Sequence, residues 1–160
     1  MLDVLTEFGA PNAHPELYIA VLYHDAIYDS RAKDNESASA ALARRELSGL
    51  GFDPSFVNRV DELIMMTRDH VPPTDDEAAA WLVDADLAII AASPADYNAY
   101  ARAIRAEYAW VPEPDYRGGR AQVLTRFLAR SPLFWVPAHQ SDWQEAARAN
   151  LERELAELSP

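Results

Sequence analysis

Histidine and aspartate side chains interrupt two otherwise apolar stretches of the chain. His24 and Asp25 lie within the segment AVLYHDAIY, and Asp84 and Asp86 lie within the segment LVDADLAII. Burying a charged group is costly unless the group is paired or coordinated. The pattern therefore indicates either a buried ion pair or a metal site.

A divalent cation explains both positions. The chain has no cysteine, so a metal ion must be held by nitrogen and oxygen ligands. Imidazole and carboxylate suit manganese, iron, magnesium, zinc, cobalt or nickel, and the sequence does not distinguish among these ions. An isolated His-Asp dipeptide would favour the ion pair, but the carboxylates in a second apolar helix favour the metal.

The order of these residues resembles that of the HD superfamily of metal-dependent phosphohydrolases, in which an adjacent His-Asp pair is followed by a distant Asp. The chain is similar in particular to a bacterial subgroup of predicted metal-dependent HD phosphohydrolases. The marks of that subgroup are spread over nearly the whole chain: YHDAIYD from Tyr23, NESA from Asn35, TRDH from Thr67, DADL from Asp84, IRAEY from Ile104, YRGGR from Tyr116 and ARAN from Ala147.

This resemblance implies an all-helical core with a divalent metal ion. It implies that His24, Asp25 and Asp86 are metal ligands. Asp84 is then expected to orient these ligands or neutralise charge without binding the metal directly. His70 is expected to face the site as a supporting residue or an additional ligand. The alternative for His70 is a surface histidine that interacts with the carbonyls at the end of its helix.

Two acids just beyond the His-Asp pair are candidate catalytic residues. Asp29 and Glu36 can orient a water molecule at the metal or accept its proton. Otherwise, Asp29 is an ordinary loop acid, and Glu36 is an acid in the first turn of a helix, where it opposes the helix dipole.

Three arginines are candidates for binding phosphate. Guanidinium groups of Arg105, Arg117 and Arg120 match phosphate oxygens, and Gly118-Gly119 would permit close approach of the backbone. The alternative is structural: Arg105 pairs with Glu107 or Asp115 and ties helices together.

The chain departs from the superfamily at the first metal ligand. That ligand is a histidine on an upstream helix, and it would fall just before Met1. His14 lies in a proline-flanked loop, which disfavours it as a replacement. Three explanations stay open: a misassigned start or a truncated chain, a metal held by fewer protein ligands, or loss of metal binding.

The composition limits the cellular location and the classes of partner that we expect for the protein. The 160 residues fit one HD-like domain, 1–160, which lacks the family's N-terminal helix. The net charge of −12 argues against a nucleic acid duplex but allows a small phosphorylated molecule. Without a signal peptide or a membrane-spanning segment, we expect a soluble cytoplasmic protein with no membrane partner. A homo-oligomer is compatible with the sequence.

Helical periodicity dominates the chain, and strand patterns are nearly absent. The expected fold is all-α, a compact single-domain helical bundle of seven or eight helices like the HD domain. The predicted helices are 2–8, 15–28, 35–49, 54–70, 75–92, 94–110, 120–130 and 142–158.

These observations predict a metal-dependent phosphohydrolase that acts on a small phosphorylated metabolite or nucleotide. The alternative is a degenerate HD domain that binds a ligand or a protein partner without catalysis, and the missing upstream histidine is its motivation.

Overall fold

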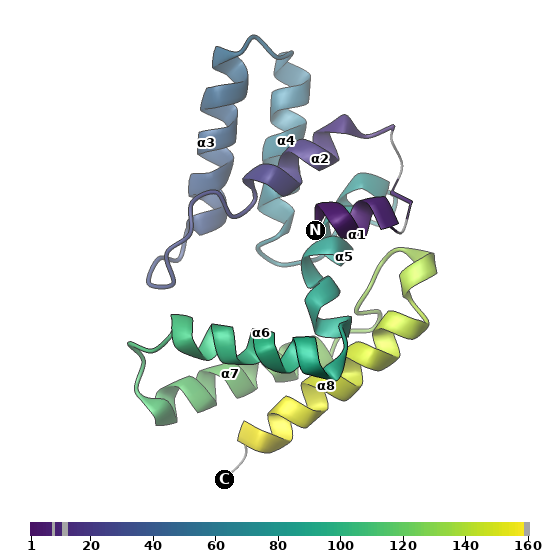
Figure 1. The fold of residues 1–160 in the computed structure, drawn as a ribbon. Coiled ribbons are helices and arrows are strands. Elements are labelled where there is room, and N and C mark those ends of the chain that lie inside the picture. Colours follow the sequence, from purple (N-terminus) through teal and green to yellow (C-terminus); the bar gives the residue numbers. More distant parts are fainter. Residues whose placement is uncertain (8, 11–12, 159–160) are drawn as a thin grey trace. The chain divides into compact units, whose positions relative to one another are not determined.

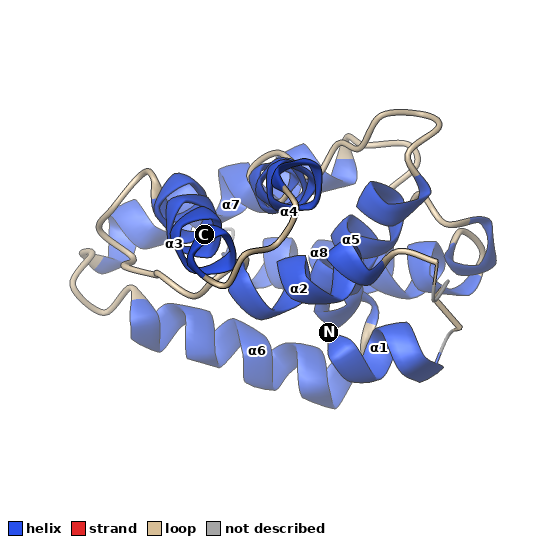
Figure 2. Ribbon diagram, turned by 90° about the horizontal axis from the view of Figure 1, so that it is seen from above, coloured by secondary structure: helices blue, strands red, loops and turns tan. Residues whose placement is uncertain are grey.

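The computed structural model describes residues 1–7, 9–10 and 13–158, and within them the fold is all-α, as predicted (Figure 2). These residues form eight α-helices and two short 3-10 helices, with no strand among them: α1 (Leu2–Glu7), α2 (Pro15–Tyr23), α3 (Asn35–Gly49), α4 (Pro54–Met66), α5 (Glu77–Leu87), η1 (Ala88–Ala91), α6 (Pro94–Glu107), α7 (Glu113–Leu128), η2 (Pro137–His139) and α8 (Asp142–Leu158). The chain divides into two compact units, Met1–Asp86 and Leu87–Pro160.

In the first unit, α3 and α4 lie side by side and α2 packs against α4 (Figure 1). The turn between α3 and α4 requires Gly51, whose φ of +82° is rarely adopted by residues with a side chain. Asp53 then caps α4 by accepting the Ser55 N–H at 2.8 Å. Apolar residues at helical spacing, including Val60 and Ile64, are fully buried.

Helix α5 is buried along most of its length, which explains its apolar sequence. Trp81, Leu82, Val83 and Asp84 are each at most 6% exposed. The prediction of one helix from 75 to 92 is wrong in detail, because the α-helix ends at Leu87 and the chain tightens into η1.

In the second unit, α8 packs against η1 and α7. The Asn150 side chain on α8 donates hydrogen bonds to the carbonyls of Ile90 at 3.0 Å and Ala92 at 2.9 Å. These carbonyls lie at the end of a short helix, where backbone acceptors lack intrahelical partners. Asn150 therefore fixes the end of η1 to α8.

The predicted helix 15–28 is also wrong in extent, since α2 ends at Tyr23. Ser39 on α3 accepts the Ile27 N–H at 3.1 Å and donates to the Ile27 carbonyl at 3.1 Å. This side chain replaces the partners that a continuing helix would supply to Ile27. The His24-Asp25 pair consequently follows the helix instead of lying inside it.

Three further predicted boundaries are wrong, and the first is the end of α6, which lies at Glu107 and not at Trp110. Helix α4 ends at Met66 and not at His70. Helix α7 begins at Glu113 and not at Arg120, so Gly118 and Gly119 lie within it. A glycine lowers helix stability by about 1 kcal/mol, which is too little to break a helix held by its neighbours.

No single helix in the described residues has the length and apolar composition needed to cross a membrane. The pair Glu77–Ala91 and Pro94–Glu107, bent by 100°, meets that test only when its two segments are taken together.

Candidate functional site

His24 follows the last turn of α2 in a fixed orientation. Its backbone N–H bonds to the Ala20 carbonyl at 2.8 Å, and its Nδ1 lies 2.8 Å from the Val21 carbonyl oxygen. A carbonyl only accepts hydrogen bonds, so Nδ1 carries the hydrogen and Nε2 of the neutral ring keeps its lone pair. A metal-ligating histidine is commonly held in this way by its second nitrogen.

The free nitrogen of His24 faces two carboxylates. Its Nε2 lies 3.5 Å from Oδ2 of Asp25 and 3.6 Å from Oδ1 of Asp86. Both distances exceed those of a well-formed hydrogen bond. The Asp25 side chain is 58% exposed, whereas those of His24 and Asp86 are 14% and 22% exposed. His24 therefore lies close to its sequence neighbour Asp25 and to Asp86, which belongs to the last turn of α5.

His70 approaches Asp86 from the turn after α4. Its Nε2 lies 3.0 Å from Oδ2 of Asp86, and its side chain is 18% exposed. The backbone of His70 has a φ of 53°, in the left-handed region that residues other than glycine rarely adopt. Such strain is commonly held in place at functional sites.

We call His24, Asp25, His70 and Asp86 the histidine–aspartate cluster. The donor types of the cluster suit a divalent first-row metal ion. As the side chains lie, no group of three or more His, Asp or Glu residues in the described part of the chain is arranged to hold a metal ion. Asp86 instead faces both imidazoles. An ion could bind only after the side chains of the cluster moved and the His70–Asp86 hydrogen bond broke.

Asp84 is fully buried, two residues before Asp86 on the same helix. Residues two apart on an α-helix project in different directions, by about 200°. Asp84 therefore lies on the buried face of α5, and Asp86 lies on a different face of the same helix.

The two predicted catalytic acids have structural contacts in the first unit. The Asp29 carboxylate accepts the Arg31 N–H at 2.9 Å within its own loop. Glu36 forms an ion pair with Arg68 at 3.6 Å. These contacts match the structural alternatives for a loop acid and a first-turn acid, and a catalytic role for either residue stays a prediction.

The predicted phosphate-binding arginines all belong to the second unit. Arg105 donates from Nε to Glu113 at 2.9 Å and from Nη1 to the Tyr108 carbonyl at 2.8 Å. The prediction that Arg105 pairs with Glu107 or Asp115 is wrong, because its ion pair is with Glu113. Glu113 is selected because it stands in the first turn of α7, close to where α6 ends.

Arg117 and Arg120 bind α8. Arg117 donates to the backbone carbonyl of Glu157 at 2.8 Å. Arg120 holds both oxygens of Glu154, at 2.7 Å from Nε and 2.9 Å from Nη2. Each of the three arginines thus binds a group of the protein itself, and their role in binding phosphate stays a prediction.

Glu154 is the principal buried acid that the sequence reasoning missed. Tyr97 also donates a hydrogen bond to it, so its carboxylate is shared by α6, α7 and α8. Burial alone would raise the pKa of Glu154, but the hydrogen bonds from Arg120 and Tyr97 outweigh it and lower that pKa. The available signal was spacing: Ala147, Asn150, Leu151 and Glu154 form the buried stripe of α8.

Burial and the hydrogen bond to Glu154 raise the pKa of Tyr97. Burial lowers the pKa of Arg120, but the hydrogen bond to Glu154 outweighs it, so the pKa is raised overall. The three groups therefore keep a neutral phenol beside a charged pair over a wide pH range.

Comparisons of the chain with models of known families, with curated proteins and with solved structures found no match. Membership of the HD superfamily accordingly stays a prediction, carried by the motifs of the chain.

Proposed function

We propose that the chain is an HD-type metal-dependent phosphohydrolase with His24, Asp25 and Asp86 as metal ligands and His70 as an additional ligand or supporting residue. The observation that supports this proposal is the meeting of His24 and His70 at Asp86. Their Nε2 atoms lie 3.6 Å and 3.0 Å from its two carboxylate oxygens. Three segments distant in sequence thus place imidazole and carboxylate groups together.

The residues of the cluster have separate roles in this proposal. The Val21 carbonyl holds the Nδ1 hydrogen of His24, which leaves Nε2 available as a donor to the ion. Asp86 supplies a carboxylate from a buried helix, and the exposed Asp25 supplies a second one next to solvent. When bound, a divalent ion lowers the pKa of a water molecule and polarises a phosphoryl oxygen.

The substrate that we propose is a small phosphorylated metabolite or nucleotide in the cytoplasm. Asp29 and Glu36 are the proposed proton acceptors, and each must exchange its present partner for water or substrate. Arg105, Arg117 and Arg120 stay predicted phosphate ligands, but each binds a group of the second unit, so the proposal does not depend on them. A net charge of −12 disfavours a polyanion more strongly than a small phosphate ester.

The second candidate function is binding without catalysis. The direct hydrogen bond between His70 and Asp86 favours it, because that bond satisfies the carboxylate without an ion. In this alternative, the cluster is a structural ion pair that joins the turn after α4 to α5.

Elemental analysis of purified protein separates the two candidates. The full-length chain, Asp86→Asn and the control Glu62→Gln are each loaded with manganese, iron, zinc or magnesium. Glu62 is a suitable control because its acid side chain is 60% exposed and pairs with Arg59 on the same helix. We expect near-stoichiometric metal in the parent and the control, and none in Asp86→Asn.

The loaded proteins are then assayed with p-nitrophenyl phosphate and nucleoside monophosphates. Hydrolysis that requires both the ion and Asp86 would support the enzyme. Bound metal without hydrolysis of any of these esters would support the metal site and exclude these substrates. If no ion binds under any loading condition, the metal site and the proposed enzyme both fail, and the structural ion pair of the second candidate is favoured.

A further inference from the structure

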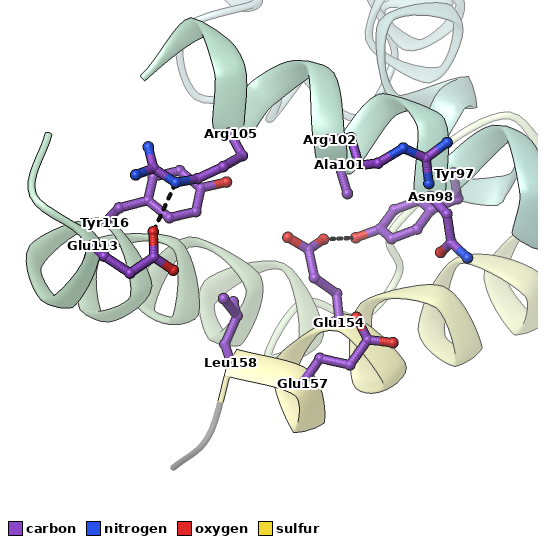
Figure 3. Close-up of a pocket in the computed structure, with 10 residues that line it drawn as sticks. All are labelled: Tyr97, Asn98, Ala101, Arg102, Arg105, Glu113, Tyr116, Glu154, Glu157 and Leu158. Atoms are coloured by element: carbon purple, nitrogen blue, oxygen red, sulfur yellow. Dashed lines mark hydrogen bonds and ion pairs between the residues drawn. The ribbon is translucent and has the colours of Figure 1, made fainter. Parts of the chain in front are cut away.

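A second candidate site lies in the second unit, where α6, α7 and α8 surround a pocket of about 390 Å³ (Figure 3). Pockets for small molecules in proteins commonly have volumes of this order. The rings of Tyr97 and Tyr116, with Ala101 and Leu158, provide apolar walls. The pocket therefore has room and apolar surface for the body of a small organic molecule.

Most of the charges around this pocket are neutralised by one another. Glu154 binds the guanidinium fork of Arg120, and Glu113 pairs with Arg105. These two ion pairs leave no net charge and occupy the groups that would otherwise bind an ion. They also hold α6, α7 and α8 together around the pocket.

Two lining residues carry the remaining charges. The Arg102 guanidinium on α6 and the Glu157 carboxylate on α8 form no hydrogen bond or ion pair with any residue that the structure describes. Figure 3 places these two residues on different walls of the pocket. The pocket thus offers one available cation and one available anion to a ligand.

We propose that this pocket binds a small zwitterion with the chemistry of an apolar α-amino acid. The ligand's carboxylate binds Arg102, and its ammonium group binds Glu157. Its apolar side chain packs against Ala101 and Leu158. An anion alone would leave Glu157 unpaired, and a cation alone would leave Arg102 unpaired.

The test uses ligands that differ by one charge. L-Phenylalanine and L-leucine carry both charges, phenethylamine lacks the carboxylate and 3-phenylpropionate lacks the ammonium group. Each is titrated into the full-length ¹⁵N-labelled protein, and amide shifts are followed by NMR. We expect saturable shifts confined to α6, α7 and α8 with at least one zwitterion, and binding at least about 10-fold weaker for both single-charge analogues.

Variants identify the residues that bind the ligand. Arg102→Gln should reduce the affinity for the zwitterion about 10-fold and change the affinity for phenethylamine little. Glu157→Gln should also reduce the affinity for the zwitterion about 10-fold, and it should change the affinity for 3-phenylpropionate little. Glu62→Gln serves as the control in the other unit and should bind as the parent does, because Glu62 is exposed and pairs with Arg59. The proposal is overturned if neither zwitterion binds, if the analogues bind equally well, or if the pocket variants leave the affinity unchanged.

Discussion

The Nε2 atom of His70 lies 3.0 Å from Oδ2 of Asp86, which joins the turn after α4 to the last turn of α5. The other oxygen of Asp86 faces His24 at 3.6 Å. One carboxylate therefore lies close to two imidazoles, one that follows α2 and one that follows α4. The residue most important to the candidate site is thus Asp86, whose two oxygens relate the other members to one another.

Replacing His70 tests whether it supports metal binding. If the cluster binds an ion, His70→Ala should lower the affinity about 10- to 100-fold, because a supporting or ligating imidazole is lost. Competition with a chromophoric chelator measures this affinity. His14→Asn is the control, since His14 contacts Glu16 and Glu77 instead of Asp86. Equal affinities for His70→Ala and the parent would contradict the role of His70.

The Arg120–Glu154 pair predicts a large loss of stability on substitution. Arg120→Ala should destabilise the protein by about 3 kcal/mol, because it leaves a buried carboxylate without its main partner. Both side chains are 10% exposed. Urea unfolding measures the change, and the exposed Arg126→Ala on the same helix should stay within about 0.5 kcal/mol of the parent. A similar small effect for both variants would refute the structural importance of the pair.

Glu154 predicts a loss of stability in acid. Its folded-state pKa lies below the ordinary value of 4.5 because hydrogen bonds outweigh burial. The unfolded chain consequently binds a proton first as the pH falls. This contribution to stability is present above about pH 4.5 and is lost as the pH falls through the folded pKa. Urea unfolding as a function of pH should show a weaker acid dependence in Glu154→Gln, and an unchanged dependence would exclude Glu154 as its source.

Tyr97 predicts the opposite behaviour in base. Burial, together with the hydrogen bond to Glu154, raises its pKa above the ordinary value of 10.0. The unfolded chain loses this proton first, so the stabilisation is complete below about pH 10 and declines as the pH rises further. Tyr97→Phe should remove this part of the alkaline decline in unfolding free energy. A decline of the same size in the variant would assign it to other groups.

The glycine pair in α7 predicts a gain of stability. Gly118 and Gly119 are exposed within the helix, and an added Cβ at either position meets nothing within 4 Å. Each Gly→Ala change should therefore stabilise the protein by about 0.5–1 kcal/mol. Gly51→Ala is the contrasting control, because its φ of +82° strains any other residue, and it should be destabilised. Thermal unfolding compares the three variants, and a loss at Gly118 or Gly119 would contradict the helical geometry of the pair.

The sequence predicted the helices well where apolar periodicity was uninterrupted. Val60 and Ile64 mark the buried face of α4, and the apolar run around Leu82 predicted a buried helix. Helix ends were less accurate because they depend on partners from elsewhere. The end of α2 is an example, since Ser39 on another helix satisfies the backbone at Ile27.

The sequence by itself determined the all-α class, most of the helices, and the buried apolar helix that carries Asp84 and Asp86. It could do so because side-chain spacing and the cost of burying charge are local properties. It wrongly placed His24 and Asp25 inside a helix, since α2 ends at Tyr23 and Asp25 is 58% exposed. Only the tertiary structure decided that His70 meets Asp86, that Arg105 selects Glu113, and that Glu154 is a buried anion shared by three helices. Such pairings depend on which helices pack together, and an exposed acid and a buried one have the same letter in the sequence.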